Sequence, residues 1–394
     1  MSRLLIGLRV WWIAVVFIVI VFLVVFSANY LGLRPTVTGS GVEGIDLPPA
    51  FAIDVYADDL GSTLLSFGGP SPGPRMMMIK DDLLFVSIPN KGLIAVLPDR
   101  NGDNLADEVQ VFISDLDYPH STDYYDGWFY IAEESRVIRV RDDDNDLVAD
   151  EGSLQVLIDT LPTGGHYTRT VKVHNGELYL SLGSSCNVCY ESNDMRAAIS
   201  KSDLDGSNFT VFAKGLRNSV GLAFHPLTGD LYGTDNGRDW LGDDLPPDEI
   251  NHITEGGDYG WPECYGKNIY DTDFNTGEYT GNLCNDTGKI PSFVDLQAHS
   301  APLGLTFYDG DSFPEEYQGD LFVCFHGSWN RQEPTGYKVV SIDMDTREVS
   351  DFATGWLRAA TISGRPVDVV VADDGSLFVS DDNAGKIYRI YYTG

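Results

Sequence analysis

Short alternations of hydrophobic and polar residues, with almost no long 3.6-residue period, run along most of the chain. Strands bounded by Gly, Asp, Asn and Pro are typical of an all-β protein. Residues 220–224 and 230–234 show the pattern clearly, because they flank a His-Pro-Leu-Thr-Gly turn. In such a turn Pro fixes φ and Gly permits positive φ. The pattern therefore predicts a chain built from β-hairpins.

One unit of this pattern, a turn followed by a strand with a central aromatic residue, occurs six times: DDLLFVS, DGWFYIA, NGELYLS, GDLYGT, GDLFVCF and DGSLFVS. The aligned aromatic residues are Phe85, Tyr130, Tyr179, Tyr232, Phe322 and Phe378. Their spacing is roughly 50 residues, with one longer interval, as in repeats that each form one blade. Six units predict a six-bladed β-propeller of four-stranded sheets around a channel, with an insertion at residues 258–300. A two-layer sandwich is the alternative, but it does not predict the recurrence.

An uninterrupted apolar run, VWWIAVVFIVIVFLVVF, occupies residues 10–26, and Leu4 to Leu8 extend it. Its length approaches the ~20 residues that span a bilayer. Arg3 and Arg9 precede the run and no acidic residue occurs before Glu43, so the positive-inside rule places the rest of the chain outside the cytoplasm. We expect residues 1–30 to be a membrane anchor or signal sequence, 31–44 a linker and 45–394 the propeller. A weak cleavage site favours an uncleaved single-pass transmembrane helix in the cell membrane over secretion.

Acidic residues dominate the charge of the chain, whose formal net charge is −33. This excess argues against nucleic acid as a partner and is explained by a solvated acidic surface. The hydrophobic content of 43% supports a large core. Proximity in the sequence predicts the disulfides Cys186–Cys189 and Cys264–Cys284 in an exported domain. Cys324 lies in an apolar strand and is expected to be a buried thiol.

Three acidic loops are candidate cation sites. Two share the spacing D-x-[ND]-x-D-x-x-x-D, from Asp99 to Asp107 and from Asp142 to Asp150. Both lack the Gly and Glu of an EF-hand, so we interpret them as solvated turns at blade edges. The third follows Asn236-Gly237-Arg238 and contains Asp239, Asp243, Asp244, Asp248 and Glu249. Its carboxylates and backbone carbonyls could hold a hard cation such as Ca²⁺.

Polar or basic residues begin the strand that precedes each repeat: Arg75, His120, His166 with Arg169, Arg217 with Asn218, His299 with Ser300, and Arg365. If these strands are innermost, their starts converge at one end of the channel. Four arginines there favour an anionic ligand, because guanidinium groups bind carboxylates in pairs of hydrogen bonds. The alternative is that each arginine pairs with an aspartate of a neighbouring blade.

A set of ordered motifs resembles one known family: GLRNSVGLAF, DEIN, GGDYGWP, SAPLGLTFY, HGSWNR, GRPVDVVVADDGSLFVSDD and GKIYRI. Over roughly residues 45–392 the chain is similar to the quinoprotein sugar dehydrogenases, specifically the sorbosone dehydrogenase-like relatives of soluble glucose dehydrogenase. The resemblance implies a six-bladed propeller that holds pyrroloquinoline quinone (PQQ) and Ca²⁺ at the wide end of its channel.

The resemblance also implies roles for residues. His166 matches the catalytic base. The implied cofactor contacts are Arg75, Arg169, Arg217, Asn218, His326, Trp329, Asn330, Arg331 and Arg365. The implied calcium site is made by the carbonyls of Gly237 and Arg238, supported by Asp248, Glu249 and Tyr259. Three positions depart from the glucose enzymes: Gly165 replaces an aspartate, Val367 an arginine, and His326 lies where those enzymes have a lysine.

The implied function is that of an exported, membrane-anchored quinoprotein that oxidises aldose sugars or sugar-derived aldehydes. A histidine of near-neutral pKa suits removal of a hydroxyl proton, and Ca²⁺ on the quinone stabilises developing charge. Electrons would pass to a separate acceptor, because Tyr190 follows Cys189 where a haem-attachment motif needs histidine. The alternatives are a calcium-dependent hydrolase of the lactonase type and a non-catalytic propeller that binds a partner or glycan at its surface.

Overall fold

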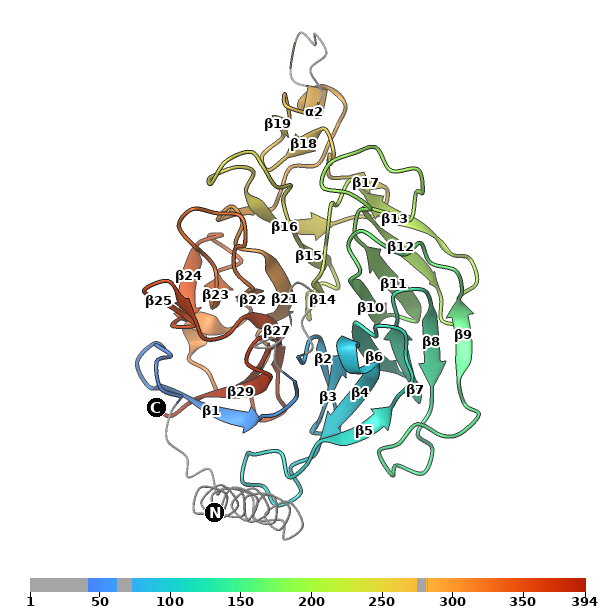
Figure 1. Ribbon diagram of the computed structural model, residues 1–394, viewed down its shortest axis with the longest axis vertical. Helices are drawn as coiled ribbons and strands as arrows, with labels where there is room; N and C mark the ends of the chain where they lie inside the picture. The colour runs from blue at the N-terminus through green and yellow to red at the C-terminus, as the bar shows by residue number, and fades with distance from the viewer. Residues whose placement is uncertain (1–41, 62–72, 275–280, 282) are drawn as a thin grey trace, which may run out of the picture. The chain divides into compact units, whose positions relative to one another are not determined.

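Six sheets surround a common centre in the computed structural model of the protein, which describes residues 42–61, 73–274, 281 and 283–394 (Figure 1). The predicted all-β, six-bladed propeller is therefore confirmed. The predicted anchor at residues 1–30 and most of the predicted linker lie outside the described residues. Within the described ranges, no helix combines the length and apolar character needed to cross a bilayer.

Each blade is a sheet of four antiparallel strands. Blade 1 contains β2 (Met77–Lys80), β3 (Leu83–Ile88), β4 (Leu93–Leu97) and β5 (Gln110–Ile113). Blade 2 contains β6 (Ser121–Tyr125), β7 (Trp128–Ala132), β8 (Val137–Val140) and β9 (Gln155–Ile158). Blade 3 contains β10 (Arg169–His174), β11 (Glu177–Leu182), β12 (Ala198–Asp203) and β13 (Thr210–Lys214), with the short parallel strand β17 (Gly257–Asp258) added at its edge.

The remaining blades follow the same plan. Blade 4 contains β14 (Leu222–Phe224), β15 (Leu231–Asp235), β16 (Asp248–Ile253) and β20 (Val294–Leu296). Blade 5 contains β21 (Pro302–Phe307), β22 (Leu321–Phe325), β23 (Lys338–Ile342) and β24 (Val349–Ala353). Blade 6 contains β27 (Pro366–Val371), β28 (Leu377–Asp381), β29 (Lys386–Tyr392) and β1 (Phe51–Ala57). Short 3₁₀ turns cover Pro89–Lys91 and Glu315–Tyr317, and β25 (Leu357–Arg358) and β26 (Thr361–Ile362) form a hairpin.

The repeated aromatic residues all lie in the second strand of a blade, as the recurrence predicts. They fill the space between neighbouring blades: the rings of Phe85 and Phe129 lie 5.0 Å apart, and those of Tyr232 and Phe307 lie 5.4 Å apart. Full burial of one such side chain stabilises the fold by about 1.5–3 kcal/mol. The six-fold recurrence thus reflects six equivalent contacts between blades.

Blade 6 joins the two ends of the propeller. Its outer strand β1 pairs antiparallel with β29, with Phe51 opposite Tyr392 and Asp54 opposite Arg389. Figure 1 shows the blue strand β1 beside the red strand β29. The ring is therefore closed by backbone hydrogen bonds between the beginning and the end of the described chain.

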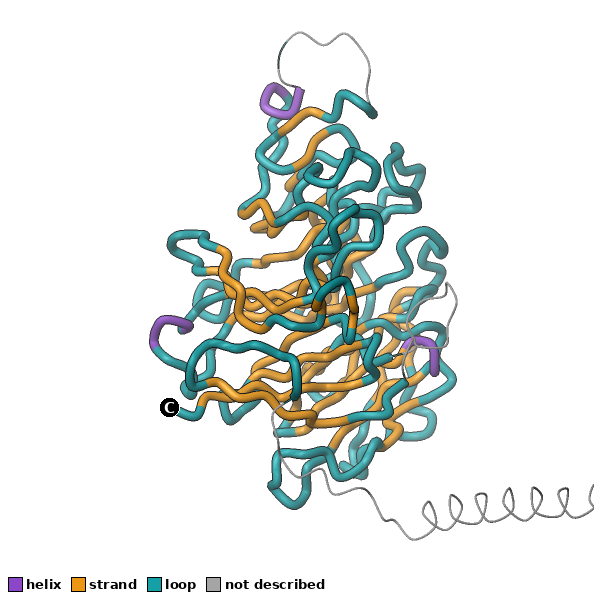
Figure 2. The backbone as a smooth tube through the Cα atoms, turned by 60° about the vertical axis from the view of Figure 1, so that its left-hand side comes forward, coloured by secondary structure: helices purple, strands orange, loops and turns teal. Residues whose placement is uncertain are grey.

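The predicted insertion lies in blade 4, between β16 and β20. It contains the hairpin of β18 (Cys264–Tyr265) and β19 (Ile269–Tyr270), followed by the short helix α2 (Leu283–Asp286). Figure 2 shows these elements extending beyond the strands of the blade. The Cys264–Cys284 disulfide connects the hairpin to α2. Both predicted disulfides are confirmed, and Cys324 is a buried free thiol.

Candidate functional site

The first strands of the blades, β2, β6, β10, β14, β21 and β27, contact one another around the channel. The polar residues that begin them therefore meet at one end, which we call the mouth: Arg75, His120, His166, Arg217, His299 and Arg365. Next to the mouth, Met76, Val220, Leu303 and Val367 pack together as a buried apolar cluster. Val367 has no exposed surface, so it serves this packing.

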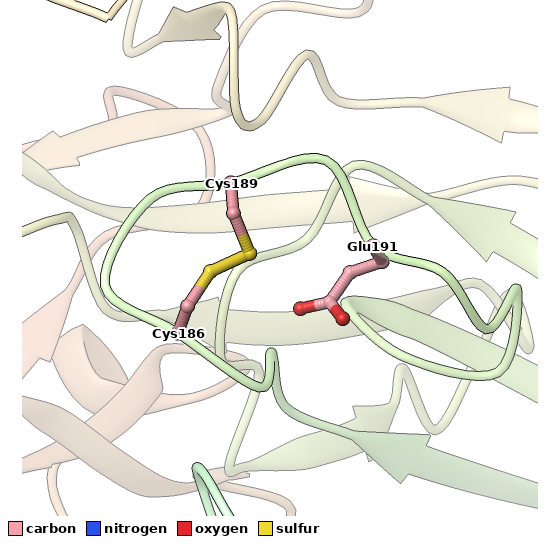
Figure 3. A group of neighbouring side chains, drawn as sticks. All are labelled: Cys186, Cys189 and Glu191. Atoms are coloured by element: carbon pink, nitrogen blue, oxygen red, sulfur yellow. A yellow bond between two sulfur atoms is a disulfide. The ribbon is translucent and has the colours of Figure 1, made fainter.

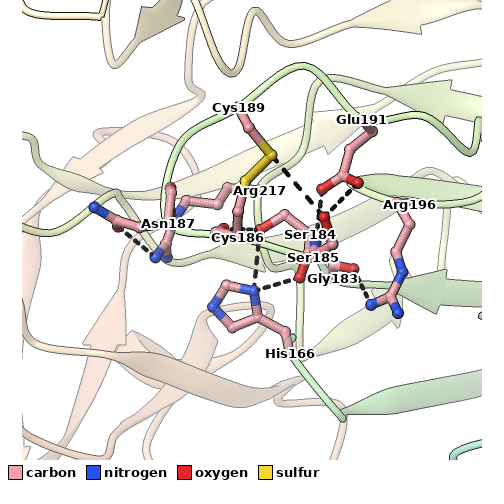
Figure 4. The surroundings of a disulfide bond; sticks show 10 residues. All are labelled: His166, Gly183, Ser184, Ser185, Cys186, Asn187, Cys189, Glu191, Arg196 and Arg217. Atoms are coloured by element: carbon pink, nitrogen blue, oxygen red, sulfur yellow. Dashed lines mark hydrogen bonds between the residues drawn. A yellow bond between two sulfur atoms is a disulfide. The ribbon is translucent and has the colours of Figure 1, made fainter. Parts of the chain in front are cut away.

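His166 lies in the loop before β10, and its ring is fixed by Ser184. Its Nδ1 lies 2.9 Å from the Ser184 carbonyl oxygen and 3.0 Å from the Ser184 hydroxyl (Figure 4). A carbonyl only accepts hydrogen bonds, so Nδ1 carries the hydrogen and Nε2 is left unprotonated. Burial, followed by the positive charge of Arg217, lowers the pKa of His166 to about 4. The ring is therefore neutral at pH 7.

Two glycines explain how the ring reaches this position. Gly165 has φ of +67°, and a Cβ there would lie 2.5 Å from the Ser185 Cα. A side chain at this point, such as the aspartate that the resemblance implies, would collide with the backbone, and Ser184 holds the histidine ring. At Gly183, a Cβ would lie 2.3 Å from the Asn218 Oδ1 and 2.6 Å from the His166 Cβ. Gly183 thereby allows these two side chains to lie side by side.

Arg217 is held by the loop of the Cys186–Cys189 disulfide. Its Nε donates to the Asn187 carbonyl at 2.8 Å and its Nη2 to the Asn187 Oδ1 at 2.9 Å (Figure 4). The same guanidinium reaches the Asn236 carbonyl at 3.1 Å and Asp239 at 3.4 Å. The Ser184 hydroxyl donates to the Cys186 carbonyl at 2.6 Å. The disulfide loop therefore contacts Ser184, which holds His166, and also contains Asn187, which holds Arg217.

Cys186, Cys189 and Glu191 lie close enough together to resemble a metal site (Figure 3). The two sulfur atoms are bonded to each other, so neither is a thiolate ligand. The Glu191 carboxylate accepts hydrogen bonds from the Ser185 backbone N–H at 2.6 Å and the Ser185 hydroxyl at 2.8 Å. This group therefore stabilises the loop.

A second polar network connects blades 1, 5 and 6. The Asp382 carboxylate accepts a hydrogen bond from Arg75 at 2.6 Å and one from the His326 Nε2 at 2.9 Å. Burial alone raises the pKa of Asp382, but His326 and Arg75 outweigh it and hold the pKa below its usual value. Arg365 contacts the His326 Nδ1 at 3.4 Å and the Tyr337 hydroxyl at 3.2 Å. For Arg75, the alternative of an aspartate partner in a neighbouring blade is confirmed.

Arg169 differs from the other predicted arginines. It has no exposed surface, and its guanidinium donates to the carbonyl oxygens of Glu134, Pro162, His166 and Thr168. Asn218 is also buried; its backbone N–H donates to Asp235 at 2.6 Å and its Oδ1 accepts from the Thr168 hydroxyl at 3.2 Å. Both residues fix the backbone around His166.

Unlike His326, the other implied cofactor contacts of the HGSWNR motif lie at the rim of the mouth: Trp329, Asn330 and Arg331. Trp329 is 67% exposed. The Asn330 Nδ2 donates to Asp239 at 2.6 Å, and the Arg331 Nη2 donates to Asp244 at 3.0 Å. The loop after β22 is thus connected to the acidic loop after β15.

All of the predicted calcium residues except Asp248 line a small cavity of about 20 Å³, enough for roughly one water molecule. Asp235, Gly237, Arg238, Glu249 and Tyr259 are among its lining residues. The Tyr259 hydroxyl donates to the His252 carbonyl at 2.5 Å, and the Arg238 Nη1 pairs with Asp271 at 2.8 Å. A Cβ on Gly237 would lie 2.8 Å from Pro246, so only glycine fits this turn.

The carboxyl groups at this cavity are buried. Asp248 accepts a hydrogen bond from the Gly237 backbone N–H at 2.8 Å, and Glu249 accepts one from the Asn251 side chain at 2.9 Å. Burial raises the pKa of Asp248 to about 6 and that of Glu249 to about 7. Burial, with the charge of Glu249, also raises the pKa of Asp235 well above its usual value. Such a group of acids binds protons or a cation readily.

Several residues of the site escape sequence reasoning, among them Ser184, Asn187, Asp235 and Asp382. Ser184, Asp235 and Asp382 lie at or just beyond the end of the second strand of a blade, which returns to the mouth because it is antiparallel to the first. Their signal in the sequence is that polar residues follow the repeated units NGELYLS, GDLYGT and DGSLFVS. Asn187 carried no signal except its place between two cysteines.

The sequence pattern of the family described as TrAA12-like matches residues 72–393. The chain belongs to the TrAA12-like family. An uncharacterized protein of Borreliella burgdorferi is 37% identical over 304 residues, which cover 72% of this chain and 78% of that protein. The PQQ-dependent pyranose dehydrogenase of Coprinopsis cinerea is 26% identical over 370 residues, covering 76% of this chain. The chain spans about half of that dehydrogenase, since 49% of its length is covered.

Solved structures share the fold of this TrAA12-like chain. The calcium structure of the Trichoderma reesei AA12 enzyme covers 91% of this chain and 99% of its own, with a TM-score of 0.76 at 19% identity. The holo PQQ domain of the Coprinopsis cinerea pyranose dehydrogenase covers 90% and 99%, with a TM-score of 0.72 at 21% identity. The chain is thus a propeller related to the PQQ-dependent sugar dehydrogenases, as its motifs indicate.

Proposed function

We propose that this TrAA12-like propeller oxidises a sugar or sugar-derived aldehyde with PQQ and Ca²⁺ and passes the electrons to a separate acceptor. One observation carries the proposal. His166 is a neutral histidine whose Nδ1 is fixed by Ser184, and it stands beside the buried guanidinium of Arg217. A base of this kind next to fixed positive charge suits removal of a proton from a hydroxyl while a bound anion is held in place.

The residues at the mouth and at its rim fit a ligand with carboxylates. Among the described residues, the buried Nε atoms of Arg75 and Arg331 have no hydrogen-bond partner. Buried polar groups without partners are costly, and a carboxylate would satisfy such donors. Arg217 and Arg365 would add positive charge around the same ligand. When bound, PQQ supplies the acceptor for the hydride of the substrate.

His166 would perform the proton transfer. Its Nε2 accepts the hydroxyl proton, and the imidazolium that forms keeps its Nδ1 hydrogen bond to the Ser184 carbonyl. That carbonyl dipole favours the charged ring, whereas Arg217 opposes it. The positive charge of Arg217 therefore favours release of the proton from His166 after the reaction.

The cavity below the Gly237 turn fits a divalent cation. The carboxyl groups in its lining belong to Asp235, Glu249 and Asp271, and Asp248 lies next to Glu249 in β16. No hydrogen bond within the described ranges reaches the carbonyl oxygen of Gly237 or Arg238. Carboxylates and carbonyls are the ligands that Ca²⁺ prefers, so these residues would hold the ion.

A membrane location is part of the proposal. It is supported by the apolar run at residues 10–26 and by two disulfides, which persist in oxidising compartments. Membrane fractionation of cells that express the full chain, with protease added from outside, tests it. Recovery of the intact chain from the soluble cytoplasmic fraction would reject this part.

The activity is tested by loading the full chain with PQQ and Ca²⁺ and measuring sugar-dependent reduction of a dye. We expect turnover with an aldose or aldehyde, and its loss in His166→Ala with PQQ binding retained. Absence of both PQQ binding and turnover contradicts the proposal. Lactone hydrolysis without PQQ would indicate the hydrolase instead, and sugar binding without oxidation would indicate a binding module.

A further inference from the structure

Two tryptophans stand together at the rim of the mouth. Trp240 follows β15 in blade 4 and Trp329 follows β22 in blade 5. Their rings meet edge to face, 5.4 Å apart at an interplanar angle of 89°, and each side chain is 67% exposed. Single exposed apolar residues are common, whereas two exposed indoles in contact form a contiguous apolar patch.

The loops that carry the two indoles are fixed to each other. Asn330 donates to Asp239 at 2.6 Å, Arg331 donates to Asp244 at 3.0 Å, and the Gln332 backbone N–H donates to Asp243 at 3.3 Å. The loop after β15 is held further by His299, whose Nε2 lies 2.8 Å from the Gly242 carbonyl. The indoles are thus positioned before any ligand arrives, which lowers the entropy cost of binding.

The pair adjoins the site described above. Asp239, next to Trp240 in the chain, pairs with Arg217 at 3.4 Å. Its backbone N–H also donates to the Asn187 Oδ1 at 2.7 Å. A ligand whose reacting end lies at His166 and Arg217 would therefore extend over the indoles when it is longer than one ring.

We propose that Trp240 and Trp329 bind a second pyranose ring of a neutral oligosaccharide substrate; this rests on the proposed function. The C–H face of a pyranose is apolar and packs on the electron-rich face of an indole. Its hydroxyls find acceptors in the neighbouring carboxylates of Asp239, Asp243 and Asp244. The same carboxylates and the net charge of −33 repel uronic acids and anionic lipids.

A protein partner fits less well. Two indoles offer at most about 500 Å², whereas a stable protein interface buries about 800 Å² on each partner. The area of the two indoles therefore suits one or two sugar rings better than a protein.

Calorimetric titration of the full chain without PQQ tests the inference, with glucose, cellotetraose and tetragalacturonic acid as probes. We expect cellotetraose to bind at least about tenfold more tightly than glucose or the acid. Trp240→Ala and Trp329→Ala should each weaken cellotetraose binding about tenfold, which corresponds to about 1.4 kcal/mol. Leu227→Ala is the control, because Leu227 is also strongly exposed, at 90%. It lies in the turn between β14 and β15, at the other end of β15 from Trp240.

Equal cellotetraose affinity in the parent and in both alanine variants overturns the inference. Binding to neutral lipid vesicles that depends on the two tryptophans, with no binding of cellotetraose, also overturns it. In the PQQ-loaded chain, the two variants should raise KM for cellotetraose by a larger factor than KM for glucose. If no PQQ binds but cellotetraose binding still depends on the tryptophans, the proposed oxidation fails while the saccharide site stands.

Discussion

A neutral histidine accepts a proton only at the ring nitrogen that carries no hydrogen. The group that accepts a hydrogen bond from the other nitrogen therefore determines which nitrogen can act as the base. Here the Ser184 carbonyl and hydroxyl hold the His166 Nδ1 at 2.9 and 3.0 Å. The sequence identifies His166 through the motif around it. It does not identify Ser184, because this contact joins two loops that come together only when β10 pairs with β11.

Replacement of Ser184 tests this support. Ser184→Ala removes the hydroxyl and keeps the carbonyl, so the His166 ring loses one of two contacts. We expect kcat/KM in the loaded enzyme to fall about tenfold, equivalent to about 1.4 kcal/mol. Ser200→Ala is the matched control, because the Ser200 hydroxyl is buried and has no hydrogen-bond partner. An equal loss in both variants would show that the effect is structural.

The backbone of the turn before β10 explains why a glycine stands where the resemblance implies an aspartate. The turn before β10 contains Gly164 with φ of +80° and Gly165 with φ of +67°. Both favour glycine for conformational reasons. Only Gly165 also faces backbone, since a Cβ on Gly164 meets nothing within 4 Å. The sequence shows the substitution, whereas its cause needs the packing of the turn against Ser185.

The two glycines give a matched pair of variants. Gly164→Ala should lower the free energy of unfolding by about 1 kcal/mol, the cost of a left-handed conformation. Gly165→Ala should lower it by at least about 2 kcal/mol more, because the backbone of Ser185 must move. Urea denaturation measures both. Equal losses would contradict the close contact seen at Gly165.

The two disulfides also differ in what they support. Cys186–Cys189 closes a loop of sequence separation 3 at the site, whereas Cys264–Cys284 closes one of separation 20 in the insertion. Longer loops gain more stability from a disulfide, about 3 kcal/mol for 15 residues. The short loop matters chiefly because Asn187 holds Arg217.

Paired serine variants separate these effects. Cys264→Ser with Cys284→Ser should lower the melting temperature and change PQQ affinity little. Cys186→Ser with Cys189→Ser should weaken PQQ binding about tenfold with the smaller change in melting temperature. Equilibrium titration with PQQ and calorimetric melting measure the two quantities. The opposite ranking would remove the short loop from the site.

For the molecule as a whole, the buried acids at the calcium cavity connect stability to pH. The pKa of Glu249 is raised to about 7 and that of Asp248 to about 6, whereas both lie near 4 in an unfolded chain. Between pH 4 and 7 the folded state keeps protons that the unfolded state has lost. These groups therefore stabilise the fold below about pH 4, and this contribution is lost as the pH rises through 7.

Calcium should offset that loss, because it replaces the protons. At pH 8, Ca²⁺ at a hundredfold excess over its Kd should add about 2.7 kcal/mol and raise the melting temperature by several degrees. At pH 5 protons compete and the gain should be smaller. Glu249→Gln should flatten the pH dependence and reduce the calcium effect. In the control Asp320→Asn, which removes another acid of raised pKa, the calcium effect should persist; its loss would contradict the site.

The recurrence of an aromatic strand predicts the number of blades and their order, because every blade meets the next through the same contact. The motifs identify most residues of the mouth. Pairings between distant segments were not predicted: β17 extends blade 3 although it belongs to the insertion of blade 4, and β1 completes blade 6. The sequences of β1 and β17 contain no pattern that indicates which strand each will pair with.

The pairing that closes blade 6 limits how early the propeller can be completed during synthesis. The hydrogen bond between Asp54 and Tyr391 joins residues 337 positions apart. At about 5–20 residues per second, a ribosome needs roughly 17–70 s to make the chain between them. For that interval β29 has not been made, and the edge that β1 will occupy does not yet exist. The propeller can therefore become a closed ring only after the last strand has left the ribosome.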